Sequence, residues 1–135
     1  MPAGYSGTPL IKKLGIKPET KLLLLNAPDN YTELLETDIS QQLITGKGVP
    51  DLVNLFVKNN AAFLAGMKAI LPLYKKNTSM VTWVCWYKKS SGMSTDITED
   101  TIRNFAVAND LVDVKVCAVS EVWSALKLVM RVSKR

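Results

Sequence analysis

Three short apolar runs constrain the fold of this 135-residue chain more than any other feature. They cover residues 21–25, 51–57 and 80–87, and the third is rich in β-branched and aromatic residues. Continuous apolar runs of this length are typical of strands that are buried on both faces, as in a parallel sheet. An apolar helical stripe over residues 63–74 separates the second and third runs, and Pro72 is expected to interrupt its last turn. Strands that alternate with helices indicate an α/β protein.

The N-terminal half adds shorter elements around the first run. A helix is expected to begin at Thr8, to hold Pro9 in its first turn and to end at Gly15, which can adopt the left-handed conformation. Residues 31–36 are expected to form a second short helix, and residues 42–45 a weak edge strand. The sheet would then have five or six strands.

The C-terminal half is expected to end in a hairpin. A helix begins near Thr98, which either caps it alone or is replaced in that role by a capping box of Asp96 and Glu99. Residues 114–119 and 125–132 are typical of two further strands. The connection between them is too short for a parallel crossover, so these strands must be antiparallel.

Together these elements predict one α/β domain over residues 1–135. The expected architecture is a three-layer, Rossmann-like sandwich with right-handed crossovers. Its sheet would be mixed and mostly parallel, with the antiparallel hairpin at one side. Cys85 and Cys117 both lie in apolar, strand-like segments, and we expect them to be buried free thiols.

The composition excludes several classes of function. The chain has no histidine, which removes His-based triads, imidazole metal sites and histidine general bases, so we assign no catalytic residue and no metal ligand. The net charge of +5 comes from lysines spread along the sequence, and nucleic acid is therefore not an expected partner. Every uninterrupted apolar run, residues 22–25 included, is far too short to cross a membrane. We expect a cytoplasmic protein that does not bind membranes.

Three blocks of sequence resemble a family of small bacterial proteins. The blocks are GYSGTPL with KKLGIK in residues 4–17, KKSSG with TDITED in residues 88–100, and LVDVKVCAV with WS in residues 111–124. The family they resemble is catalogued as a domain of unknown function, number three thousand and fifty-two in the usual series. This resemblance implies no activity, cofactor or catalytic residue. The chain departs from the pattern at Tyr87, where proline is expected, and at Ala125, where glycine is expected.

The candidate site lies where the three apolar runs end. Open α/β sheets bind ligands outside the carboxyl ends of their strands, at the point where the strand order reverses. The segments 26–28, 58–60 and 88–95 should converge there, and their cations and hydroxyls, with the N-terminus of the helix at Glu99, suit a phosphate or carboxylate. The candidate ligand-binding residues are Asn26, Pro28, Lys58, Lys88, Lys89, Ser91, Thr95 and Asp96. The competing interpretation is that the lysines are solvated and the acids only cap a helix.

Three classes of function stay open. The first is a domain without chemistry of its own that binds an anionic small molecule or a protein partner at this site. The second is an enzyme, either a reduced methyltransferase or another transferase, because the order of elements is similar to the latter part of a class I methyltransferase fold. The turn at residues 26–29 lacks the glycines that dinucleotide or S-adenosylmethionine binding requires, so we assign no cofactor. The third is a structural protein that self-associates through the edge of the hairpin.

Overall fold

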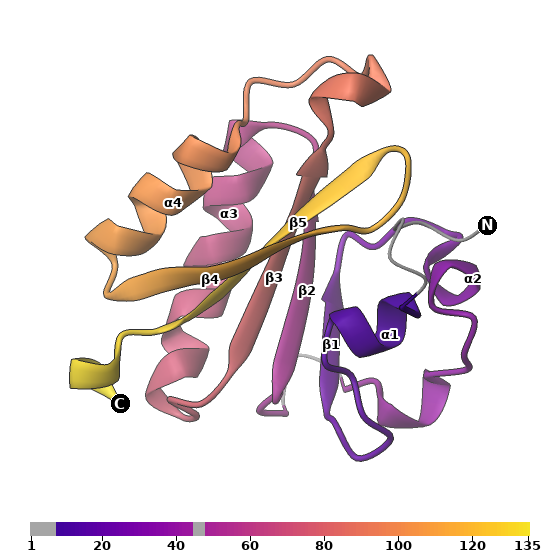
Figure 1. Cartoon of the computed structure of the whole chain (residues 1–135). Coiled ribbons are helices and arrows are strands. Elements are labelled where there is room, and N and C mark those ends of the chain that lie inside the picture. The colour runs from indigo at the N-terminus through magenta and orange to yellow at the C-terminus, as the bar shows by residue number, and fades with distance from the viewer. Residues whose placement is uncertain (1–7, 45–47) are drawn as a thin grey trace.

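A five-stranded sheet with helices on both faces forms the structure, a computed structural model that describes residues 8–44 and 48–135 (Figure 1). The strands are β1 (Leu22–Leu25), β2 (Leu52–Val57), β3 (Val81–Tyr87), β4 (Leu111–Ala118) and β5 (Trp123–Met130). The α-helices are α1 (Leu10–Lys13), α2 (Tyr31–Leu35), α3 (Asn60–Ile70) and α4 (Glu99–Ala108). Short 3-10 helices cover Ser40–Gln42, Leu71–Lys75, Lys89–Ser91 and Val132–Lys134.

The strand order is β1-β2-β3-β5-β4. The strands β1, β2 and β3 are parallel to one another, whereas β5 is antiparallel to both of its neighbours, β3 and β4. It follows that β4 points in the same direction as β3 and that β5 is inserted between them in the opposite direction. This arrangement confirms the α/β class, the mixed sheet and the antiparallel hairpin at one side.

The prediction of an edge strand over residues 42–45 is wrong for residues 42–44, which the structure describes. Residues 42–44 make a single bridge to the sheet, between Leu43 and Leu22, and Gln42 ends a 3-10 helix. The Gln42 side chain donates instead to the carbonyls of Lys17 and Thr20, at 2.8 and 2.9 Å, which holds this segment against the loop before β1. Thr45 and the block at residues 4–7 lie outside the described residues.

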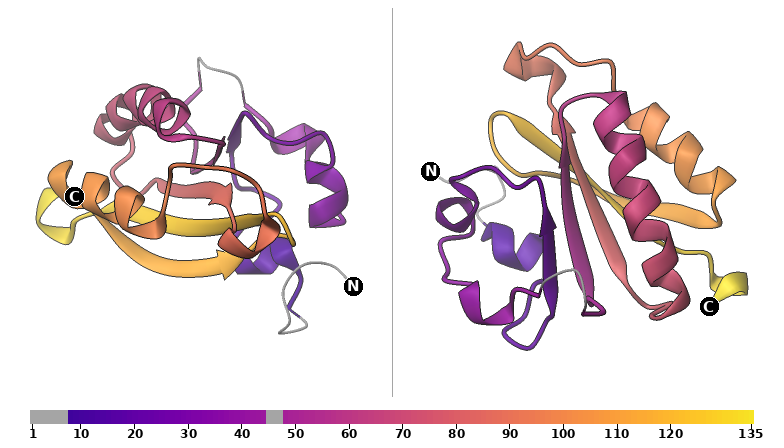
Figure 2. Two further views of the ribbon diagram at one scale, coloured as in Figure 1. Left: turned by 90° about the horizontal axis from the view of Figure 1, so that it is seen from above. Right: turned by 180° about the vertical axis from the view of Figure 1, so that it is seen from behind.

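Each face of the sheet has its own core. On β2, Phe56 points to one face, where it packs with α1 and α2, and its neighbours Leu55 and Val57 point to the other face, against α3 and α4. Figure 2 shows the same division, with α1 and α2 on one side of the sheet and α3 and α4 on the other. We call these the α1 face and the α3 face. The two cores give the three layers that the sequence predicts.

The cysteines belong to the core of the α1 face. Cys85 on β3 and Cys117 on β4 are both free and buried, as expected from their apolar surroundings.

Among the helices in the described part of the chain, none has the length and apolar character that a membrane crossing requires.

The expectation that every crossover is right-handed is wrong for the first one. The connection from β1 to β2 passes over the α1 face through α2, and the connection from β2 to β3 passes over the α3 face through α3. Both connections step in the same direction across the sheet, so they must have opposite hands. The views in Figures 1 and 2 show that the connection through α3 is right-handed. The handedness rule applies to regular strand–helix–strand units, and α2 has only five residues within a long irregular connection.

Most element ends follow the local signals. Gly15, at φ 76°, ends α1, and Pro72 lies in the 3-10 segment that follows α3. Pro9 occupies the cap position of α1 rather than its first turn. Of the two starts considered for α4, the structure has the Thr98 cap, which forms a capping box with Thr101.

Candidate functional site

The ends of three neighbouring parallel strands bring the predicted segments to one edge of the sheet. Leu25 at the end of β1 is in register with Leu55 of β2, and Val57 at the end of β2 is in register with Trp86 of β3. Residues 26–28, 58–60 and 88–95 therefore leave the sheet at its carboxyl edge.

The strand order does not reverse at this edge, which corrects one premise of the sequence analysis. The order runs from β1 through β2 to β3 without a change of direction. The chain leaves β1 toward the α1 face and leaves β2 toward the α3 face, so the two connections diverge at this edge.

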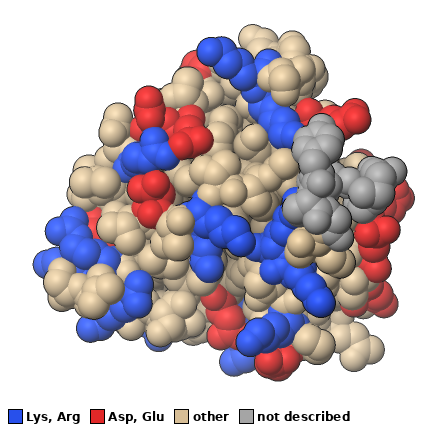
Figure 3. All heavy atoms as spheres, viewed as in Figure 1, with Lys and Arg blue, Asp and Glu red and all other residues tan. Residues whose placement is uncertain are grey.

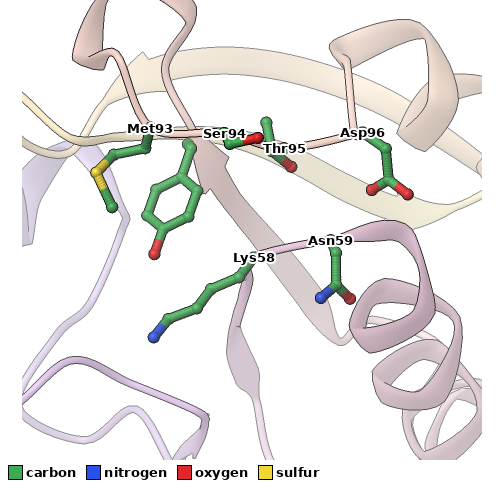
Figure 4. Close-up of a pocket in the computed structure, with 7 residues that line it drawn as sticks. Lys58, Asn59, Met93, Ser94, Thr95 and Asp96 are labelled. Atoms are coloured by element: carbon green, nitrogen blue, oxygen red, sulfur yellow. The ribbon is translucent and has the colours of Figure 1, made fainter.

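A pocket of about 610 Å³ lies at this edge, beside the ends of β2 and β3 (Figure 4). We call it the exit pocket. Its lining residues are Lys58, Asn59, Tyr87, Met93, Ser94, Thr95 and Asp96. Lys58 and Asn59 lie between β2 and α3, Tyr87 ends β3, and the others belong to the loop between β3 and α4.

Two side chains accept from N–H groups at the start of α3, and one of them, Asp96, holds the loop there. The Oδ1 atom of Asn59 accepts from the backbone N–H of Ala62 at 2.8 Å, which caps the helix. The Oδ1 atom of Asp96 accepts from the N–H of Asn60 at 2.7 Å. Helix N-termini carry unpaired N–H groups and a partial positive charge, and these two oxygens satisfy donors that an anionic ligand would otherwise use.

The N-terminus of α4, which the sequence offered as an anion site, does not line the exit pocket. Its first turn is capped from within, because the N–H of Thr101 donates to Thr98 Oγ1 at 3.3 Å. The acids Glu99 and Asp100 instead form ion pairs with Arg103, and Arg103 also pairs with Asp113 on β4. The competing interpretation in the sequence analysis, that these acids have a structural role, fits α4.

Lys58 is the one cation that lines the exit pocket. Figure 4 shows its side chain extending away from Asn59 and Asp96. Within the described residues, the salt bridges involve only Arg103 and Arg131 as cations, so the Lys58 ammonium has no ion-pair partner there. An exposed, unpaired ammonium can bind an anionic group of a ligand at little desolvation penalty.

An aromatic column supports the wall formed by Tyr87. The Tyr87 ring stacks on Trp123, with centroids 4.6 Å apart and an interplanar angle of 25°. Trp123 meets Phe56 edge to face at 5.0 Å, and Phe56 meets Tyr31 in the same way at 5.6 Å. Tyr87 is only 8% exposed, so this ring is held in place before any ligand arrives. A fixed aromatic surface favours a flat or apolar part of a ligand.

The hydroxyls of the loop have local partners. Ser91 Oγ donates to the carbonyl of Lys88 at 2.6 Å and accepts from the N–H of Met93 at 3.1 Å. Thr95 Oγ1 accepts from the N–H of Ile97 at 3.2 Å, so its own proton is available for the pocket. The loop is also joined to the hairpin, because the N–H of Lys88 donates to the carbonyl of Val122 at 2.8 Å.

Three of the eight predicted site residues line the exit pocket, namely Lys58, Thr95 and Asp96. The other five lie near the same edge without lining it: Asn26, Pro28, Lys88, Lys89 and Ser91. Asn26, with φ 59°, begins the turn after β1, and Lys88 to Ser91 form the first part of the loop.

Four lining residues were missed by the sequence analysis: Asn59, Tyr87, Met93 and Ser94. A signal existed for two of them. Asn59 directly precedes a helix, where a capping side chain is expected, and Tyr87 is the last residue of an apolar run before a polar loop. Met93, which is 47% exposed, lies in the predicted segment 88–95, but nothing in the sequence singles out its side chain.

The buried Cys85 thiol is poorly suited to chemistry. Burial raises the pKa of the Cys85 thiol well above its ordinary value, and the nearby Cys117 acts in the same direction. The Cys85 thiol donates to Asn54 Oδ1 at 3.4 Å, and both residues are inaccessible to solvent. A neutral, sealed thiol is not a nucleophile. Among the described residues, no group of three or more His, Cys, Asp or Glu side chains is arranged to hold a metal ion.

Comparisons with known proteins give no relative by sequence and a weak structural likeness. No protein-family model matches the chain, and neither does any curated protein. One similar solved structure is a protein in the NADB-Rossmann superfamily from Streptococcus agalactiae, with 10% sequence identity and a TM-score of 0.45. The alignment covers 97% of this chain and 71% of that chain. The resemblance to the bacterial family of unknown function stays a prediction.

Proposed function

We propose that this domain binds a small molecule with one anionic group in the exit pocket and performs no chemistry on it. The observation that carries the proposal is that two groups line the same pocket at the carboxyl edge of the sheet. They are the Lys58 ammonium, which has no ion-pair partner among the described residues, and the fixed aromatic ring of Tyr87. Pockets that bind small molecules combine a largely apolar surface with a few placed polar groups.

The charges of the pocket narrow the ligand class. Lys58 suits a carboxylate or a phosphate, and Tyr87 with Met93 suits an apolar or planar portion. Asp96 presents a carboxylate to the same space, and only its Oδ1 atom is used by the N–H of Asn60. A second negative charge on the ligand would be repelled there, whereas a hydroxyl or amine could donate to the carboxylate. We therefore favour a hydroxy acid, an amino acid or a similar monoanion.

The test is a thermal-shift screen of monocarboxylates, amino acids, sugar phosphates and nucleotides, followed by calorimetry on any hit. A ligand present at one hundred times its Kd stabilises the folded state by about 2.7 kcal/mol, which shifts Tm by several degrees. Lys58→Gln should abolish the shift, and Lys68→Gln, which removes an exposed charge from α3, should not. A shift that is equally large in wild type and Lys58→Gln would overturn the assignment of the pocket.

A reduced methyltransferase-like or other transferase enzyme is the alternative proposal. It rests on the inserted antiparallel strand, which fits the similarity to the latter part of a class I methyltransferase fold. The turn after β1 begins with Asn26 in a left-handed conformation at φ 59° and contains no glycine, which argues against close approach of a cofactor. Stabilisation by S-adenosylmethionine that survives Lys58→Gln would favour this alternative.

The proposal also includes a protein partner that binds at the same edge of the sheet. We further propose that the chain belongs to the bacterial family of unknown function, that its fold is Rossmann-like and that the protein is cytoplasmic. The partner is supported by the exposed loop of residues 88–96. A partner that docks there should lose affinity when Met93, the exposed apolar residue of the loop, is changed to aspartate. Unchanged affinity would place the partner elsewhere.

A further inference from the structure

A second pocket lies on the α1 face, between α1 and the edge strand β4. Its volume is about 390 Å³, and we call it the lysine pocket. Its lining residues are Thr8, Lys12, Lys13, Lys115, Val116, Cys117 and Ala118. The fold thus brings together lysines that are about a hundred positions apart in the sequence. In the sequence they belong to the lysines spread along the chain, and nothing there indicates that they meet.

A fourth lysine adds to the charge of this region. Lys127 on β5 is the register partner of Lys115 on β4, so the two point to the same face of the sheet. Like charges directly opposite each other in a sheet are unfavourable. Figure 3 shows blue side chains near the centre of this view and a separate group of red side chains over α4, at the left.

No carboxylate neutralises these lysines in the described part of the chain. The salt bridges there use Arg103 and Arg131, and no acid lines the lysine pocket. The nearest acid along β4, Asp113, is bound to Arg103 at 3.0 Å. Three unpaired ammonium groups in one hollow, with a like-charged register pair beside it, are an arrangement that a bound polyanion would stabilise.

The Cys117 thiol lies among the residues that line the lysine pocket. Cys117 is 9% exposed, and burial raises the pKa of its thiol. The ammonium groups of Lys13 and Lys115 act in the opposite direction on the pKa of the same thiol.

We propose that the lysine pocket binds a small molecule that carries two or more linked phosphate groups. Lysine ammonium groups act as point charges that bind phosphate oxygens, and three of them match a chain of phosphates better than one carboxylate. The exit pocket differs because it contains Asp96 with a single lysine. A nucleic acid strand would need a longer stripe of cations than the three lysines of the hollow and Lys127 beside it.

The probe for this proposal is inorganic triphosphate, measured by calorimetry on the full chain at low and moderate salt. Triphosphate should bind more tightly than inorganic phosphate, and added salt should weaken the binding. Lys13→Gln and Lys115→Gln should each lower the affinity by about tenfold or more, as expected for the loss of a charge-assisted contact. Lys68→Gln, an equal loss of charge on α3, should leave the affinity unchanged.

Two further measurements separate the proposal from its competitors. Bound triphosphate should slow alkylation of Cys117, whereas Cys85, which is fully buried, should stay unreactive throughout. Lys58→Gln should leave triphosphate binding intact, so a failed exit pocket and a failed lysine pocket give different results. Far-UV circular dichroism and Tm verify that each variant is folded.

Four outcomes would overturn the proposal. They are no measurable binding of triphosphate to the wild type, equal affinity for phosphate and triphosphate, an equal loss in Lys68→Gln and Lys115→Gln, and tighter binding of a DNA or RNA oligonucleotide through the same lysines. The last outcome would identify the hollow as part of a nucleic-acid surface.

Discussion

Replacement of Asp96 by alanine should destabilise the fold and loosen the exit pocket together. The Asp96 carboxylate accepts from the N–H of Asn60 at 2.7 Å, and this contact joins the loop after β3 to the first turn of α3. The same loop supplies four of the seven residues that line the pocket. The contact is exposed, so its contribution is that of a surface helix cap rather than of a buried ion pair.

The magnitude follows from two effects. Loss of a capping acceptor costs about 1 kcal/mol, within a range of about 0.5–2 kcal/mol. Loss of a negative charge near a helix N-terminus costs a further 0.3–1 kcal/mol or so at low ionic strength. Asp96→Ala should therefore lower the free energy of unfolding by about 1–2 kcal/mol, which is roughly 3–8 °C in Tm for a domain of this size. Asp96→Asn keeps an acceptor and should lose only about 0.5 kcal/mol.

Urea unfolding followed by tryptophan fluorescence measures these differences. Asp29→Ala is the matched control, since Asp29 is exposed and makes no hydrogen bond or ion pair with the described residues. Any ligand of the exit pocket should bind more weakly to Asp96→Ala than to Asp96→Asn. If Asp96→Ala and Asp29→Ala unfold at the same urea concentration, the contact with α3 contributes nothing and the reasoning fails.

Three further predictions concern the core. Gly66→Ala should destabilise the domain by about 1 kcal/mol although alanine favours helices, because the new Cβ would lie 2.6 Å from a methyl carbon of the buried Leu55. A raised urea midpoint would show instead that the Leu55 side chain moves freely. Trp83→Phe should lower the free energy of unfolding in urea by about 2–3 kcal/mol. It removes indole volume from the core and leaves the Leu14 carbonyl without the 2.9 Å hydrogen bond from Trp83 Nε1. A loss of less than about 0.5 kcal/mol would contradict this reasoning. Burial raises the pKa of Tyr74 to about 12. The contribution of the neutral Tyr74 side chain to the free energy of unfolding is therefore complete below pH 10, and up to about 2–3 kcal/mol of it is lost as the pH rises from 10 to 12. Tyr74→Phe should flatten the dependence of stability on pH across that interval, and an equally steep loss in both proteins would refute the assignment.

Sequence patterns were sufficient for the strands that are buried on both faces. The runs that became β1, β2 and β3 are apolar because each strand packs against helices on both sides, and this produces a signal that no surface element shares. The boundaries of the hairpin were less accurate. β4 begins at Leu111, three residues before the expected start, because its exposed edge allows polar residues such as Asp113 within the strand.

The candidate site was only partly predictable. Lys58 and Asp96 were found because both follow from the rule that ligands bind at the carboxyl ends of strands. The path of the loop decides which of its side chains line the pocket, and that path depends on contacts with Asn60 and Val122 that are distant in sequence. The lysine pocket was not predictable, because it depends on the position of α1 beside β4 in the folded chain.

The insertion of β5 between β3 and β4 has a consequence for biosynthesis. A ribosome releases β4 before β5, yet β4 has no partner in the sheet until β5 has emerged. During translation, β1, β2 and β3 can pair as they appear, but β4 must wait as an unpaired segment with exposed valines. The nascent chain would thus complete its sheet in one late step, and a stalled or prematurely terminated product that lacks residues 123–130 would be an aggregation-prone fragment and a target for chaperones or proteases.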